Sequence, residues 1–152
     1  MSALWDWALA AYARDGAAEA CLILQDAHGQ NVPLLLWAVW SSRERRAPDD
    51  AAVGQAAALA RRWEAAATAP LRSVRRELKQ DMDGVPAAER IAFRDHVKAV
   101  ELEAERLLMR NLELLASAEP AARDEAELLS AVASAYGAAL EPGRFGPLLA
   151  AL

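Results

Sequence analysis

The chain of 152 residues, 55% of them hydrophobic, is long and apolar enough for one domain with a sizeable core, which excludes a disordered tail or linker protein. Its formal net charge of -5 argues against a general attraction to nucleic acid or to an anionic membrane surface. Cys21 is the only cysteine, so an internal disulfide and a cysteine-based metal site are excluded. Alanine is abundant and β-branched residues are sparse, and this composition predicts an all-α fold.

Two helices are predicted in the first 30 residues. Ser2 is a favourable N-cap residue for the first helix, which extends to about residue 14. Asp15 is expected to cap the second helix and Gly29 to end it, because glycine readily adopts the left-handed conformation that follows a helix. The N-terminus lacks the basic and long apolar regions of a secretory signal, so a cytoplasmic location is expected.

The central prediction concerns residues 32–40, with the sequence VPLLLWAVW, which are apolar on every side of a helix. Asn31 is a favourable N-cap, and Pro33 lies in the first turn, where its missing N–H removes no hydrogen bond. The segment is far too short to cross a membrane, so we expect it to be buried inside the protein. The sequence therefore predicts a single domain over residues 1–152, a bundle-like fold of six or seven helices around a central helix at about 32–42.

A basic helix face follows. The chain is expected to break between an alanine-rich helix at about 51–67 and a fifth helix, which Thr68 caps and Pro70 opens. The fifth helix carries four cations at i, i+3, i+4 and i+7, opposite its apolar side, and like charges at this spacing need compensation. Internal carboxylates, an acidic partner protein, or a phosphate-bearing ligand or nucleic acid can provide it, and the sequence leaves these three open. The candidate partner-binding residues are Arg72, Arg75, Arg76 and Lys79.

The longest predicted helix begins at Pro86 and reaches about residue 116 without an internal glycine or proline. Its seam residues, named at the end of this paragraph, are spaced alternately four and three positions apart, as in a coiled coil. A second apolar line through Leu108, Leu112 and Leu115 lies beside this seam and widens the apolar face of the helix. The pattern predicts a homodimer in which Asn111 sets the register; the alternative is that other helices of the same chain cover both lines. The candidate self-association residues are Phe93, Val97, Val100, Ala104, Leu107, Asn111 and Leu114.

The C-terminal region is predicted to hold one more helix. After Pro120, the spacing of Leu128, Leu129 and Tyr136 is typical of a helix that faces a core. The tail that follows, residues 141–152, is interrupted by glycine and proline and is expected to be weakly structured.

Three stretches of the N-terminal half carry a family resemblance. They are LWDWALAAY at residues 4–12, ACLILQDAHGQNV at residues 20–32 with the LLLWAVW that follows, and Trp63 together with PLRSVRRELK at residues 70–79. On these stretches the chain resembles a proteobacterial family of conserved hypothetical proteins, the domain of unknown function 2390. The resemblance implies a small helical cytoplasmic bacterial protein, and it brings no activity with it.

Neither a metal site nor a cofactor is predicted. The histidines His28 and His96 lack a second ligand three or four residues away, and the carboxylate pair Glu101 and Glu105 is expected on a solvated helix face. Cys21 falls on the apolar side of the second helix, which is typical of a buried thiol. No phosphate-binding loop, nucleophile elbow or dinucleotide fingerprint occurs in the sequence, which lowers the weight of an enzymatic function without excluding it.

Three polar residues lie close to the large apolar side chains of the first helices. Asp6 falls between two tryptophans, while Gln25 and Asp26 end the second helix next to the central one. They are candidates for a polar pocket or for buried ion pairs, and Arg72 or Arg75 is the expected ion-pair partner of Asp6 or Asp26.

The first functional hypothesis is a non-enzymatic interaction or adaptor protein that uses helical surfaces and the basic patch. The alternative is a small-molecule-binding protein or enzyme for an anionic or prenyl-like ligand in a helical pocket lined by Arg and Trp. Weak nucleic-acid binding is the third. The expected partners are a second copy of the chain, an acidic protein, or an anionic small molecule. A closed apolar cavity with Arg heads pointing into it would favour the second hypothesis, and a solid core the first.

Overall fold

The structure of the protein, a computed structural model, describes residues 2–152. Within that range it is a single all-α domain, as predicted, and the only pairing of extended residues is an isolated bridge between Arg46 and Ala121. A π-helical segment, Glu64–Thr68, joins α4 to α5, and a 3-10 turn, Pro142–Phe145, precedes α8. The helices are α1 (Ala3–Tyr12), α2 (Ala17–Asp26), α3 (Val32–Arg43), α4 (Asp50–Trp63), α5 (Ala69–Glu77), α6 (Ala87–Glu113), α7 (Glu125–Tyr136) and α8 (Gly146–Ala151).

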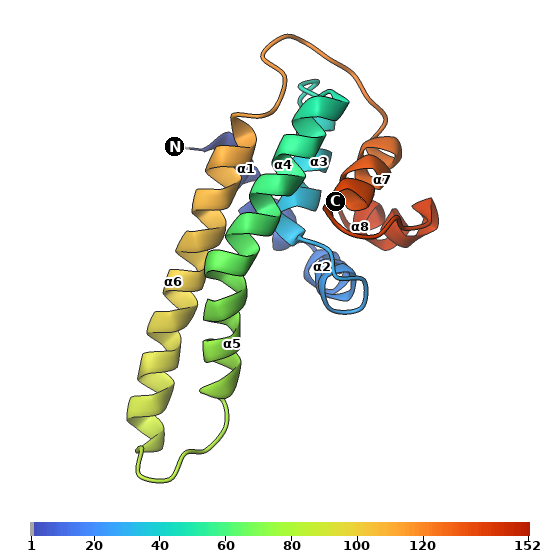
Figure 1. Cartoon of the computed structure of the whole chain (residues 1–152). Coiled ribbons are helices and arrows are strands. Elements are labelled where there is room, and N and C mark those ends of the chain that lie inside the picture. The colour runs from blue at the N-terminus through green and yellow to red at the C-terminus, as the bar shows by residue number, and fades with distance from the viewer. Residues whose placement is uncertain (1) are drawn as a thin grey trace.

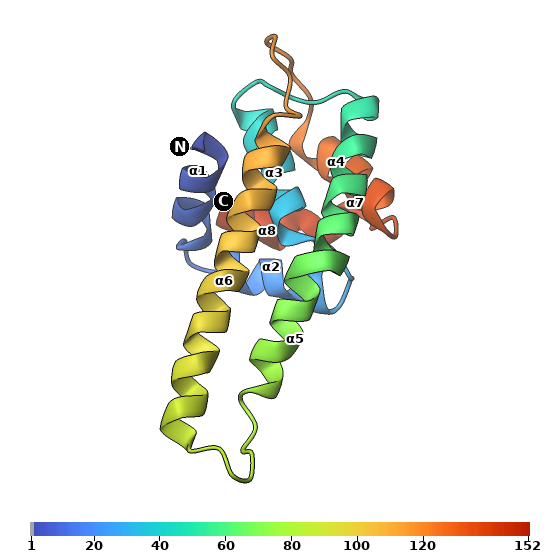
Figure 2. The ribbon, with the colours of Figure 1, turned by 60° about the vertical axis from the view of Figure 1, so that its left-hand side comes forward.

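Helix α3 lies in the centre of the molecule, with α1, α4, α6 and α7 around it (Figure 1, Figure 2). Residues 34–41 are all buried, and Trp37 and Trp40 expose 0% and 3% of their surface. Asn31 Oδ1 accepts a hydrogen bond from the Leu34 amide at 3.0 Å, so the helix begins where the sequence places it. The prediction of a buried central helix is confirmed.

A side chain also caps α1, α4 and α7, whereas α2, α5, α6 and α8 begin without a side-chain cap. Ser2 Oγ accepts a hydrogen bond from the first turn of α1 at 3.3 Å, and Asp49 and Asp124 cap α4 and α7 in the same way. The prediction that Asp15 caps α2 is wrong, because the residue at the cap is Gly16, with a φ of 82° and no side-chain hydrogen bond. Glycine tolerates this left-handed conformation, and the chain uses it to turn from α1 into α2.

The chain does not break between α4 and α5, contrary to the prediction. It passes through the π-helical turn, in which the amide of Ala69 donates to the carbonyl of Glu64, five residues earlier. Thr68 has helical backbone angles and caps nothing, and its hydroxyl donates to the Glu64 side chain. Pro70 explains the wide turn. In a regular α-helix its ring would clash with the preceding turn, and its nitrogen has no hydrogen to donate to that turn.

Helix α5 and the first half of α6 extend beyond the body as an antiparallel hairpin, which we call the arm (residues 69–100; Figure 1, Figure 2). Within the arm only Arg90 and Val97 are buried. The Arg90 guanidinium closes the end of the arm by donating to the carbonyl of Leu78 at 2.7 Å. Because α5 has mainly α6 as its neighbour, it cannot bury the apolar side predicted for it, and Val74 is exposed.

The side of α6 that packs against the rest of the chain differs from the predicted seam. Leu108 and Leu112, on the second apolar line, are buried in the core, so other helices of the same chain cover this line. From the predicted seam, Val97 and Ala104 are buried within the chain. The other seam residues are exposed to solvent, Leu107 and Asn111 at the border with α4, and we call them the α6 outer stripe: Phe93, Val100, Leu107, Asn111 and Leu114.

The C-terminal segment is more ordered than predicted. Residues 141–152 form the 3-10 turn and α8, and the side chains of Phe145 and Leu148 are fully buried in the core. Burial of these large apolar side chains holds a segment whose local sequence signals are weak. The Arg43 guanidinium also donates to the carbonyl of Leu152 at 2.9 Å. Among residues 2–152, none of the helices has both the length and the hydrophobicity needed to cross a membrane.

Candidate functional site

Four charged side chains meet where the arm joins the body, and we call them the ion-pair cluster: Glu64, Arg72, Arg75 and Glu101. Arg72 Nη1 donates to Glu64 Oε1 at 2.8 Å, and its Nε lies 3.4 Å from Glu101 Oε1. Arg75 binds the same Glu101 carboxylate with two nitrogens, Nη2 at 3.3 Å from Oε1 and Nε on Oε2. The side chains of Arg72 and Glu101 are 14% and 9% exposed, so these pairs are largely shielded from water.

The π-helical turn and the start of α3 hold Glu64 in place. Its Oε2 accepts hydrogen bonds from the Thr68 hydroxyl and from Asn31 Nδ2, the latter at 3.4 Å. Asn31 is also the N-cap of α3, so one side chain connects the buried central helix to the cluster. π-helical turns are frequent at functional sites, and here the turn supplies both Glu64 and Thr68.

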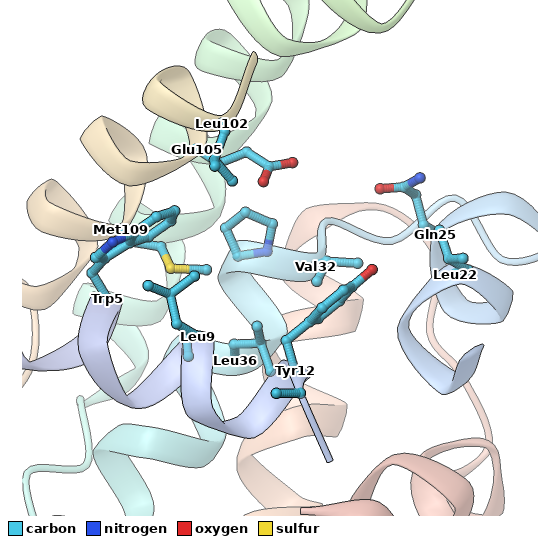
Figure 3. A pocket seen from close by; sticks show the side chains of 13 residues that line it. Trp5, Leu9, Tyr12, Leu22, Gln25, Val32, Leu36, Leu102, Glu105 and Met109 are labelled. Atoms are coloured by element: carbon cyan, nitrogen blue, oxygen red, sulfur yellow. The ribbon is translucent and has the colours of Figure 1, made fainter. Parts of the chain in front are cut away.

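Beside the cluster, α1, α2, α3 and α6 surround a cavity of about 280 Å³ that is open on one side, which we call the α1–α6 pocket (Figure 3). Its wall is mainly apolar, and its rim is apolar as well, since Leu22 and Leu102 are exposed there. Figure 3 shows the polar tips of Tyr12, Gln25 and Glu105 on the same side of the pocket. The lining residues are Trp5, Ala8, Leu9, Tyr12, Ala13, Leu22, Gln25, Val32, Pro33, Leu36, Leu102, Glu105 and Met109.

Glu105 lies in the wall of the pocket and also in the wall of an adjoining groove, which includes Arg75, Lys98 and Glu101. Among residues 2–152, its carboxylate makes no ion pair and no hydrogen bond. Burial raises the pKa of Glu105 to about 7, and the charge of Glu101 adds to the rise, whereas Arg72 and Arg75 oppose it. Glu105 therefore exchanges a proton near neutral pH at the junction of pocket and cluster.

Burial also raises the pKa of two other titratable groups near the pocket, Cys21 and Tyr12. Burial raises the pKa of the Cys21 thiol to about 11, so the thiol is not an activated nucleophile at neutral pH. Burial also raises the pKa of Tyr12, and the charges of Cys21 and Glu105 add to that rise. In the part of the chain that the structure describes, no three His, Cys, Asp or Glu side chains could hold a metal ion together. Glu105 is thus the carboxyl of this pocket whose pKa is raised to about 7.

The three polar residues predicted for a pocket lie in different places. Gln25 lines the α1–α6 pocket. Asp26 is exposed and forms a surface ion pair with Arg76 at 3.5 Å, and Asp6 is exposed on α1. The expected pairing of either aspartate with the cluster arginines is not formed, because α5 turns those arginines toward glutamates of the π-helical turn and α6.

The four cations of the predicted basic face do not point in one direction. Arg72 and Arg75 face α6 and belong to the ion-pair cluster, while Arg76 and Lys79 are exposed on the surface of the arm. Internal carboxylates therefore pair with Arg72 and Arg75 and, at the exposed surface, with Arg76, and this was one of the three forms of compensation that the sequence left open. Binding of a partner by these residues stays a prediction.

Glu64, Glu101 and Glu105 were not predicted as site residues. The sequence pattern assigns Glu101 and Glu105 to a solvated face, whereas in the fold they lie beside Ala104 and Leu108 on the inner side of α6. The sequence signal that could have indicated their burial is that the two glutamates alternate with apolar residues along the same side of the helix. A carboxylate at a buried helix position needs a counter-charge from another helix, and the arginines of α5 provide it.

The fold and the site together define a class, a small all-α protein with an apolar pocket beside a shielded ion-pair cluster. The chain belongs to the family described as protein of unknown function (DUF2390), which matches residues 3–112. The match extends beyond the resemblance over residues 4–79 and includes every residue of the α1–α6 pocket and of the ion-pair cluster. No curated protein and no solved structure matches the chain.

Proposed function

We propose that the protein is a non-enzymatic binding protein for a small apolar molecule, which occupies the α1–α6 pocket. The observation that carries the proposal is the pocket itself. It is a concave, mainly apolar cavity with a volume of about 280 Å³ and a few polar groups on one side. This is the general form of a small-molecule site, and its volume fits a ligand of modest size.

The apolar rim of the pocket supports the same proposal. Large apolar side chains that gather around one opening, such as Leu22 and Leu102, are a common mark of a ligand or partner site. An anionic ligand fits this site less well than an uncharged or cationic one, because Arg72 and Arg75 are already bound by carboxylates. The polar group that the pocket offers is Glu105.

Methyl NMR of Met109, which lines the pocket, tests the proposal, with the exposed Met82 in the loop of the arm as an internal reference. Three probes are titrated into the protein: 1-hexanol, hexylammonium and hexanoate. At least one should shift the Met109 methyl signal in a saturable way and leave Met82 unchanged. Ala13→Phe at the rim should remove the shift, and Ala10→Phe, exposed on α1 outside the pocket, should not. Failure of all three probes to move Met109 refutes the proposed function.

Self-association is a second candidate, favoured by the α6 outer stripe. Its apolar members recur every seven residues, which is the spacing of a coiled-coil seam, so the same helix of a second copy is the partner that fits. Leu114 exposes 77% of its surface. Asn111 Nδ2 donates to the Leu107 carbonyl of its own helix at 2.7 Å and would have to rotate to pair with a second Asn111. An interaction or adaptor function would use this surface.

An acidic protein partner, if the arm binds one, would meet Arg76 and Lys79 rather than the whole basic face. Two exposed cations give a weak electrostatic attraction that salt screens readily. Nucleic-acid binding, which requires several phosphate contacts, is correspondingly the least supported of the three initial hypotheses.

A further inference from the structure

The charges beside the α1–α6 pocket do not balance. Three carboxylates, those of Glu64, Glu101 and Glu105, lie near the two guanidiniums of Arg72 and Arg75. Both guanidiniums are bound by the first two carboxylates, so the site lacks one positive charge when all three carboxyl groups are ionised. A shielded carboxylate without a counter-ion is unfavourable, and Glu105 responds by keeping a proton up to a pKa of about 7.

No neighbouring group of the described chain supplies the missing charge. Lys98 is exposed in the wall of the adjoining groove and makes no ion pair among residues 2–152. Tyr12 and Gln25 cannot carry a positive charge, because a phenol ionises only to an anion and an amide is uncharged. The other charged groups that face Glu105 are the four of the ion-pair cluster, which are engaged with one another. The place left for a cation is on the pocket side of Glu105.

We propose that the ligand of the α1–α6 pocket is an apolar amine, whose ammonium group pairs with Glu105 while its apolar body lies against Trp5, Leu36 and Met109. This inference rests on the proposed function and names the chemical class of its ligand. On binding, the Glu105 carboxyl releases its proton to solvent and the ammonium keeps its own, so the ligand takes the place of that proton. The aromatic rings of Trp5 and Tyr12 add a favourable environment for a cation.

A carboxylate or phosphate head group is disfavoured at the same position. It would place a further negative charge beside Glu105 and Glu101, and the nearby guanidiniums are already bound. An alcohol can donate a hydrogen bond to Glu105 but cannot provide the missing charge. Ligands with the same apolar chain and these three head groups are therefore expected to bind the pocket with different affinities.

The test measures the binding of hexylammonium, 1-hexanol and hexanoate by titration calorimetry at pH 6 and pH 8. At pH 8 hexylammonium should bind at least about tenfold more tightly than 1-hexanol, because hydrogen bonds between charged groups are the stronger kind. Its affinity should fall about tenfold at pH 6, where Glu105, with a pKa of about 7, must first lose its proton. Calorimetry in buffers of different ionisation enthalpy should show close to one proton released for each hexylammonium bound at pH 6.

Glu105→Gln should abolish both the preference for hexylammonium over 1-hexanol and its pH dependence, because glutamine carries no negative charge. Glu103→Gln, an exposed position on the same helix, is the matched control and should behave as wild type. Proton release in the wild type provides a readout that holds even where the glutamine variant does not fold.

Two outcomes separate this inference from the proposed function. Equal binding of hexylammonium and 1-hexanol by the wild type, or binding of hexylammonium without proton release, overturns the assignment of an amine and leaves the pocket as a ligand site. Absence of binding by all three probes overturns the proposed function as well.

Discussion

Replacing Glu105 by glutamine should make the protein more stable at pH 8 and leave its stability almost unchanged at pH 4.5. Burial raises the pKa of Glu105 from 4.5 to about 7. A carboxyl whose pKa is higher in the folded state favours folding most below pH 4.5, where it is protonated in both states, and this advantage is lost as the pH rises through 7. At about 1.4 kcal/mol per pH unit, the difference corresponds to on the order of 3 kcal/mol as an upper value.

Because Glu105 is partly exposed at the pocket, water screens some of this effect, and we expect a gain of about 1 to 2 kcal/mol at pH 8. Glutamine has nearly the same shape and no charge, so packing should change little. Urea unfolding followed by circular dichroism at pH 4.5, 6, 7 and 8 gives the free energy of unfolding for wild type, Glu105→Gln and the control Glu103→Gln. A difference between wild type and Glu105→Gln that stays constant over this range would refute the reasoning, because it would mean that Glu105 does not titrate in the fold.

Three further predictions test the core, the ion-pair cluster and the outer stripe. Trp37→Ala should cost about 3 to 5 kcal/mol, because the packed surroundings of α3 cannot close the cavity; a thermal melt close to that of wild type would contradict the central position of α3. Arg75→Ala should cost about 2 to 4 kcal/mol, since it leaves Glu101 shielded without its two-nitrogen partner, whereas Arg76→Ala, at an exposed pair, should change the unfolding free energy by less than about 0.5 kcal/mol. Equal effects of the two arginine variants in urea unfolding would exclude a structural role for the cluster. Asn111→Leu should increase the mass measured by light scattering across a concentration series, and a wild type that is monomeric at high micromolar concentration would exclude the homodimer.

The amino-acid sequence by itself determined the helical class and the centre of the fold. A helix that is apolar on every side, as residues 32–40 are, has no face suited to water, so it is buried whichever way the other helices pack. Asn31 and Pro33 set its first turn through a hydrogen bond and backbone angles that involve only neighbouring residues. Such features depend on local chemistry, and local chemistry can be inferred from a sequence.

The tertiary structure alone decided which side of each amphipathic helix meets its neighbours, and with it the site. On α6 the seven-residue pattern suits an inner or an outer face equally well, and only packing buries Leu108 and exposes Leu107. The projection of α5 as half of a two-helix arm turns Arg72 toward Glu101. The spacing of residues gives the angles between side chains on one helix, but burial and counter-charges come from other helices. For this reason the sequence predicts Glu105 on a solvated helix face, whereas in the fold it lies in the pocket wall with a pKa of about 7.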